Sequence, residues 1–157
     1  MSPDRIKLLQ DMAIFGGISE RSLQFLLDRS NRIQVSADDY FFREDDTAES
    51  MFILDSGTVD ILKSWNGQTR FLRSLAPGDC FGEVALMDMM PRSASVRATT
   101  AAVAIELPRS ALYELMQSDL EQFTMIMMNM GREVSRRLRK SDTRLFEVQQ
   151  DGHFYTE

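Results

Sequence analysis

The sequence predicts an α+β domain in which helices at both ends enclose a central antiparallel β-barrel or sandwich. Three observations predict this class. Residues 3–30 show a helical apolar period, and short apolar runs separated by turn residues fill the region from Ile33 to Leu107. A helical period returns from Ser110 to about Val148. With 157 residues, the chain is long enough for one domain with its own core.

The first segment, residues 1–31, is expected to contain two helices. Gly16-Gly17 separates them, because paired glycines favour a turn over a continuing helix. Ser19 is a favoured N-cap residue for the second helix. The apolar positions at helical spacing, which we expect on the buried faces, are Ile6, Leu9, Met12, Ala13, Leu23, Leu26 and Leu27.

The central segment, residues 32–108, is expected to form the barrel. Asn66-Gly67 between two strand-like runs predicts a hairpin with a type I′ turn, in which both central residues take positive φ. Ser56-Gly57 and Pro77-Gly78-Asp79 predict two further turns, and residues 82–92 predict a short helix and a loop inserted between strands. The expected strands are residues 32–36, 40–43, 50–55, 58–64, 68–75, 95–98 and 102–107.

The last segment, residues 109–148, is expected to be helical, with residues 149–157 as a tail. Within it, apolar and small residues recur at alternating steps of four and three, which is the heptad seam of a coiled coil. Charged residues fill the flanks, so we expect a parallel homodimer that pairs through this helix. The same stripe also fits an amphipathic helix lying on its own barrel. The seam consists of Met127, Gly131, Val134, Leu138, Ser141, Leu145 and Val148.

The composition argues against several classes of protein. The net charge of −6 disfavours a broad nucleic-acid surface, and no apolar run is long enough to span a membrane. With one cysteine, Cys80, the chain can form no internal disulfide, which fits a reducing cytoplasm. Its one histidine, His153, lies in the polar tail, and no metal-binding or phosphate-loop motif is present. We therefore expect no enzyme and no metal or other cofactor.

The residues best suited to bind a small ligand lie within residues 78–96. Gly82 lets the backbone approach a ligand closely, and the short helix after it directs free N–H groups towards an anion. Arg92 carries a forked guanidinium that can contact two phosphate oxygens, and Pro91 restricts the backbone before it. Glu83 can accept a hydrogen bond from a ribose hydroxyl. The same residues are equally compatible with a surface ion pair between Glu83 and Arg92 beside an ordinary bulge.

This stretch resembles the phosphate-binding cassette of the cyclic-nucleotide-binding domain family, whose pattern is FGE[LIV]AL, a short loop and PR[STA]A[ST]V. Here residues 81–86 read FGEVAL and residues 91–96 read PRSASV. The nine-residue step from Glu83 to Arg92 matches the protein kinase A regulatory subunits and the cyclic-nucleotide-gated channels. It is one residue shorter than in the bacterial cAMP receptor protein. The resemblance covers residues 1–148 and implies an eight-stranded jelly-roll barrel with its cassette at residues 81–96.

The resemblance also implies a role for each cassette residue. Glu83 would bind the ribose 2′-hydroxyl and Arg92 the cyclic phosphate, with the hydroxyl of Ser93 nearby. The other expected ligand-binding positions, whose backbone would complete the anion cradle, are Gly82, Val84, Ala85 and Ala94.

Two turns depart from the family pattern, because Asp39 and Asp45 stand where glycine is usual. Aspartate tolerates the left-handed backbone better than most residues. We therefore expect both turns to be intact and somewhat strained.

The C-terminal helix is expected to cover the base of the nucleotide. Residues 134–142 resemble the dimer helix of the bacterial members of the family. Ser141 falls where that helix reaches the adenine, and Asp142 falls where the partner subunit contributes. Alternatively, Ser141 only loosens the seam. In the family, threonine after the arginine is associated with cGMP in some members and alanine with cAMP in others, while serine, as at Ser93, occurs in the cAMP-binding bacterial receptor. We therefore expect cAMP rather than cGMP.

Together these features predict a regulatory module that binds a 3′,5′-cyclic nucleotide and performs no chemistry on it. It would be a stand-alone sensor that signals through its C-terminal helix to an effector protein of unknown identity, without direct contact to nucleic acid or membrane. Only a short tail follows the long helix, so we expect no helix-turn-helix domain. The alternative is a degenerate domain of the same fold that serves protein interaction or dimerisation and binds no nucleotide.

Overall fold

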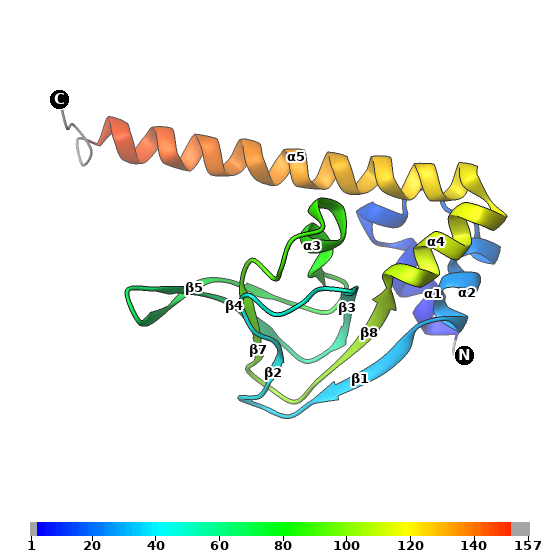
Figure 1. Cartoon of the computed structure of the whole chain (residues 1–157), viewed down its shortest axis with the longest axis horizontal. Helices are drawn as coiled ribbons and strands as arrows, with labels where there is room; N and C mark the ends of the chain where they lie inside the picture. Colours follow the sequence, from blue (N-terminus) through cyan, green and yellow to red (C-terminus); the bar gives the residue numbers. More distant parts are fainter. Residues whose placement is uncertain (1–2, 152–157) are drawn as a thin grey trace.

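The computed structural model describes residues 3–151, which form two four-stranded antiparallel sheets with most of the helices gathered at one end (Figure 1). One sheet has the order β1 (Asn31–Val35), β8 (Ala102–Pro108), β3 (Ser50–Ser56) and β6 (Cys80–Phe81). The other has the order β2 (Tyr40–Phe42), β7 (Ser95–Ala98), β4 (Val59–Trp65) and β5 (Gln68–Leu75). The predicted eight-stranded jelly roll with flanking helices is thereby confirmed.

The helices follow the predicted order. They are α1 (Pro3–Gln10), the 3₁₀ helix η1 (Ala13–Phe15), α2 (Glu20–Asp28), α3 (Glu83–Asp88), α4 (Arg109–Ser118) and α5 (Leu120–Gln150). Helix α3 interrupts the strands between β6 and β7, as the sequence predicts. Strand β6 is not among the strands expected from the residue pattern, because two residues are too few to show a period.

The central strand β3 serves two cores at once. Successive side chains of a strand point to opposite faces. Met51 and Ile53 belong to the apolar cluster under the helices, whereas Phe52 and Leu54 belong to the barrel interior. All four are at most 4% exposed. This burial on both faces explains why the strand appears in the sequence as a continuous apolar run.

Positive φ angles mark the tight turns. The Asn66-Gly67 turn joins β4 to β5 with φ angles of 49° and 73°, which confirms the predicted hairpin. Asp45 has a φ of 72°, as expected for a position that favours glycine. The prediction for Asp39 is wrong by one residue, because Asp38 takes the left-handed conformation with a φ of 71°. The N–H of Asp38 donates to a carbonyl oxygen at the end of β7 at 2.7 Å, and this bond fixes the turn.

The N-terminal segment differs from its prediction at one buried position. Helix α1 ends at Gln10 and is followed by a 3₁₀ turn. A 3₁₀ turn has three residues per turn, so the residues that point into the core differ from those that a continuing α-helix would bury. Ile14 and Phe15 enter the core with 2% exposure each, whereas Ala13 is exposed. The prediction that Ala13 is buried is therefore wrong. The predicted N-cap is confirmed, because the Ser19 hydroxyl accepts the N–H of Ser22 at 3.2 Å.

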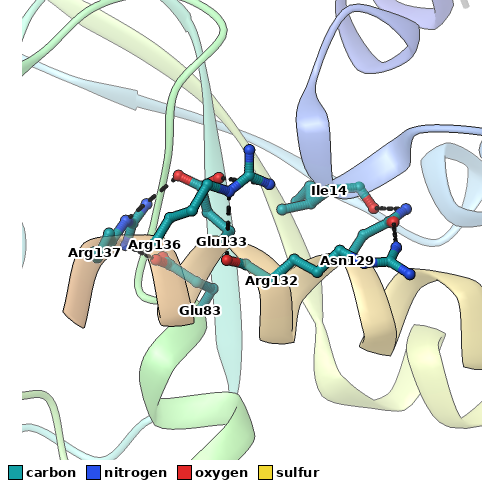
Figure 2. A network of polar contacts seen from close by, with 7 residues as sticks. All are labelled: Ile14, Glu83, Asn129, Arg132, Glu133, Arg136 and Arg137. Atoms are coloured by element: carbon teal, nitrogen blue, oxygen red, sulfur yellow. Dashed lines mark hydrogen bonds and ion pairs between the residues drawn. The ribbon is translucent and has the colours of Figure 1, made fainter. Parts of the chain in front are cut away.

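The C-terminal segment consists of two helices that meet at Asp119, whose side chain accepts the N–H of Gln122 and caps α5. Two polar contacts hold the first half of α5 on the N-terminal segment. Gln122 accepts the N–H of Ser19 at 2.8 Å. Asn129, which is buried, donates to the carbonyl oxygen of Ile14 at 3.2 Å (Figure 2). It also donates to the carbonyl oxygen of Gly16 at 2.9 Å.

The second half of α5 continues beyond α3, towards the side of the molecule where the β4–β5 hairpin lies (Figure 1). From Leu138 onward its side chains are exposed, and Leu138 and Leu145 are 60% and 57% exposed. The heptad seam is therefore divided. Met127 and Val134 are half-buried on the chain's own body, and the later seam residues face outward. Among the helices of residues 3–151, none is both long and apolar enough to cross a membrane.

Candidate functional site

Arg92 lies in the loop after α3 and is only 4% exposed. Its Nη1 donates to the carbonyl oxygen of Gly82 at 3.1 Å, and its Nη2 lies 3.5 Å from the Ser50 hydroxyl. The guanidinium stacks over the ring of Phe42 at 4.1 Å. A buried cation with these few partners has donor capacity left for an anion.

The backbone around Arg92 is held from both directions. Its N–H donates to the carbonyl oxygen of Asp46, and its carbonyl oxygen accepts the N–H of Asp45, both at 2.9 Å. The next residue is held as well, because the Lys63 ammonium donates to the carbonyl oxygen of Ser93 at 2.8 Å. The β2–β3 loop and β4 thus fix the position of the arginine before any ligand binds.

Gly82 is the N-cap of α3 and has a φ of 79°, which favours glycine. A Cβ added there would lie 2.5 Å from Nη1 of Arg92. Both its conformation and its contact with the guanidinium therefore require a residue without a side chain.

Glu83 is the first residue of α3 and is 2% exposed. Its carboxylate forms an ion pair with Arg137 of α5, which also lies 3.7 Å from Glu133 (Figure 2). The alternative of a surface ion pair between Glu83 and Arg92 is wrong, because both side chains are buried and Glu83 is paired with α5 instead.

Seven of the nine residues expected to bind ligand line one cavity of about 60 Å³. They are Gly82, Glu83, Val84, Ala85, Arg92, Ser93 and Ala94. The other two, Ser141 and Asp142, lie on the exposed half of α5 and do not line it. Small-molecule pockets usually measure at least about 300 Å³, so this cavity, which Arg137 of α5 also lines, is smaller than a typical ligand site.

The cavity has a strongly positive lining. Arg73, Arg92 and Arg137 face one carboxylate, that of Glu83. Burial is the largest single influence and lowers the pKa of Arg137, but the charges of Glu83, Cys80 and Glu133 and the hydrogen bond to Glu83 together raise it by more, so the net shift of its pKa is upward. The guanidinium therefore stays charged. Three cations against one anion suit a ligand that carries a negative charge.

Cys80 borders this region but offers no reactive thiolate. Burial raises its pKa to about 12, and the negative charge of Glu83 adds to the effect. The thiol therefore stays protonated at neutral pH. Within residues 3–151 no three side chains of the metal-binding types gather into a metal site.

The sequence did not single out Arg137, Arg73 or Asn129. Arg137 is one of six basic residues between Arg132 and Arg144, and the pattern does not show which of them faces the cassette. A sharper signal was available, because Arg137 lies one helical turn before Ser141, which was predicted to face the ligand. Arg73 lies on β5, and only the barrel closure brings it to the cavity.

Comparison with known proteins agrees with this geometry. Residues 32–119 match a family model described as the cyclic nucleotide-binding domain. The chain is 29% identical over 108 residues to a cAMP-dependent protein kinase regulatory subunit of Emericella nidulans, which covers 69% of this chain and 26% of that protein. It is 28% identical over 137 residues to the cyclic AMP receptor protein of Thermus thermophilus, covering 84% of this chain and 60% of that protein.

Solved structures show the same relationship. The crystal structure of the Thermus thermophilus catabolite activator protein superposes with a TM-score of 0.77 at 26% identity, covering 87% of this chain and 63% of that chain. The chain thus spans about a quarter of the kinase regulatory subunit and about three fifths of the bacterial receptor. The family model matches more than half of the chain, including the cassette and α4, and ends where α5 begins. The chain therefore belongs to the cyclic nucleotide-binding domain family.

Proposed function

We propose that this protein binds cAMP, and cGMP less tightly, as a regulatory sensor that does not alter its ligand. The observation that carries the proposal is that Glu83 and Arg92, both buried, line one positively charged cavity. Both curated relatives described above are named for cAMP, which supports this nucleotide. The single buried thiol of Cys80 suits a cytoplasmic location.

In this proposal Arg92 binds the cyclic phosphate through two parallel hydrogen bonds. Glu83 accepts a hydrogen bond from the ribose 2′-hydroxyl. Ser93 offers a hydroxyl beside the phosphate. The remaining cassette positions, which contribute backbone to the cradle, are Gly82, Val84, Ala85 and Ala94.

The contact between Arg137 and Glu83 links the ligand site to α5. The ribose needs the Glu83 oxygen that Arg137 now contacts, so the nucleotide displaces Arg137. The displaced guanidinium can then pair with the cyclic phosphate a short distance away. Ligand binding thereby exchanges one partner of α5 for another, and α5 becomes the element that reports the ligand to an effector protein.

Isothermal titration calorimetry with cAMP, cGMP and the non-cyclic AMP tests the proposal. We expect micromolar or tighter binding of cAMP, weaker binding of cGMP and no measurable binding of AMP. Recovery of unaltered cAMP by mass spectrometry would exclude turnover. The alternative function is a domain of the same fold used only for protein contacts, and the small size of the cavity favours it. Absence of heat with every nucleotide would support that alternative.

A second prediction concerns the response of α5. We expect hydrogen exchange across residues 133–148 to slow by roughly two- to fivefold with saturating cAMP, which is the size of effect that a partly exposed ion pair provides. Residues 120–132 should not change, because Asn129 already holds them. Slower exchange around residues 82–95 alone would show that the domain binds nucleotide passively.

A third prediction concerns assembly. The exposed seam residues of α5 fit a parallel coiled coil with a second copy, in which Ser141 of one chain and Asp142 of the other approach the adenine. Light scattering should give a dimer for the wild type and a monomer for Leu138→Asp. Phe146→Asp is the control, because Phe146 is 60% exposed on the same half of α5 but is not a seam residue. A monomeric wild type with and without cAMP would contradict the prediction.

A further inference from the structure

A groove in the described part of the chain shares Arg92 and Phe42 with the cassette cavity. It encloses about 770 Å³, within the usual range for small-molecule sites. It lies between strands β2, β3 and β8 and the start of α4, where β8 leads into that helix (Figure 1). None of the predictions above assigns a role to this groove.

One wall of the groove is aromatic. Phe41, Phe42 and Phe52 come from β2 and β3, and Tyr113 of α4 stands at the groove with 46% exposure. The phenylalanine rings contact one another, with centroids 5.6 Å apart for Phe41 and Phe52 and 5.7 Å apart for Phe42 and Phe52. This wall suits the apolar side chain of a small ligand.

Five charged side chains line the same groove, and they do not pair with one another. They are Arg92, Arg109, Asp46, Glu49 and Glu106. Among residues 3–151 no ion pair within 4.0 Å joins any two of these five. Charges of both signs therefore remain available to a ligand.

The two arginines have unused donors. The Nε of Arg92 and the Nε of Arg109 are both buried without an acceptor in the described residues. Arg92 is itself 4% exposed. Arg109 is held in place, because its Nη2 donates to the carbonyl oxygen of Ala48 at 3.1 Å and its backbone N–H donates to the backbone carbonyl oxygen of Glu49 at 2.8 Å. A buried charged donor without a partner is costly. Both guanidinium groups line the groove, so their uncompensated positive charge favours a negatively charged ligand group beside them.

We propose that this groove binds a small zwitterion with an apolar side chain, of the chemical class of a free α-amino acid. Its carboxylate would accept from Arg92 and Arg109. Its ammonium group would face Glu49 and Glu106, and its side chain would pack on the phenylalanine wall. Two cations against three carboxylates give the lining a net charge of −1, so a simple anion is disfavoured and a ligand with both charges fits.

Binding in this groove would also affect the nucleotide, because Arg92 lines both cavities. A carboxylate that engages Arg92 competes with the cyclic phosphate, and such coupling is reciprocal. This consequence rests on the proposed nucleotide function, whereas the groove site itself does not.

Three probes that share one ring test the groove without any nucleotide. They are L-phenylalanine, 3-phenylpropionate, which lacks the ammonium group, and phenethylamine, which lacks the carboxylate. Each probe is titrated in the millimolar range against the full chain, and binding is followed by chemical-shift changes in the NMR spectrum of the protein. L-Phenylalanine should bind roughly tenfold more tightly than either of the others. Equal binding of all three, tighter binding of a singly charged probe, or no binding of any would overturn the proposal.

Matched variants locate the site. Arg109→Gln should weaken L-phenylalanine and 3-phenylpropionate by roughly tenfold and leave phenethylamine unchanged. Arg97→Gln is the control, because Arg97 also has a buried Nε without an acceptor but lies on β7 outside the groove. An equal effect of the two variants would contradict the assignment. If Arg109→Gln fails to fold, the comparison of the three probes on the wild type still decides.

Discussion

Replacing Arg92 with alanine is expected to weaken cAMP binding by well over tenfold. The substitution removes a buried bidentate partner of the cyclic phosphate, and the loss of such a charge-assisted contact costs about 2–5 kcal/mol. Arg73 and Arg137 remain in the cavity but cannot replace the lost geometry, since they lie on β5 and α5 and not at the position that the β2–β3 loop holds for Arg92. Calorimetry with cAMP measures the effect directly.

Arg92 also packs inside the protein, so loss of folding must be separated from loss of binding. Thermal unfolding of the variant provides that check. Arg92→Lys is the matched variant, because it keeps the charge but not the planar fork, and it should fall between wild type and alanine. A folded Arg92→Ala protein that binds cAMP as tightly as wild type would refute the role of Arg92.

The second large effect concerns Glu83 and the ribose. Glu83→Ala and the ligand 2′-deoxy-cAMP each remove one side of the same hydrogen bond, which is worth about 1.5–3 kcal/mol for a charged acceptor. In a double cycle the combined loss should therefore be no greater than either loss alone. Calorimetry at the four corners of the cycle measures the coupling.

The structure shows a second possible role for Glu83, which the double cycle can distinguish from ribose binding. Glu83 also holds α5 through Arg137, so Glu83→Ala could weaken binding only by releasing the helix. That effect would be the same for cAMP and its 2′-deoxy form, and the two losses would then add. Arg137→Ala is the comparison, because it releases α5 but leaves the carboxylate, so its loss should add to that of 2′-deoxy-cAMP whatever phosphate contact it also removes. Additive losses would mean that Glu83 anchors the helix and does not contact the ribose.

Much of the fold follows from local signals in the sequence. The Asn66-Gly67 turn needs two positive φ angles, and few residue pairs allow this conformation. The hydroxyl of Ser19 caps α2 within one turn of chain. Such features depend on neighbours a few residues apart, and they were predicted correctly. The predictions for Ala13 and Asp39 were each wrong by one residue. At Ala13 a 3₁₀ turn makes the next residue the buried one, and at Asp39 a tertiary hydrogen bond makes the preceding residue the one with positive φ.

The cassette side of the cavity was also predictable, because its seven lining positions lie within a stretch of thirteen residues, 82–94. Gly82 and Glu83 are adjacent, and the short loop to Arg92 limits where the guanidinium can reach. In a contiguous motif of this kind, the short chain between the residues already limits how far apart their side chains can lie. The sequence alone thus determined the family, the antiparallel barrel and the residues on one side of the cavity.

Only the tertiary structure decided what faces the cassette from elsewhere. Arg137 contacts Glu83 across 54 positions of the chain, and Asn129 contacts Ile14 across 115. Helical period shows which residues share a face but not which neighbour that face meets, because the docking of α5 depends on the whole barrel and the N-terminal helices. The groove lined by Arg92 and Arg109 also depends on the tertiary structure, because β2, β3, β8 and α4 form it only after the sheets have packed.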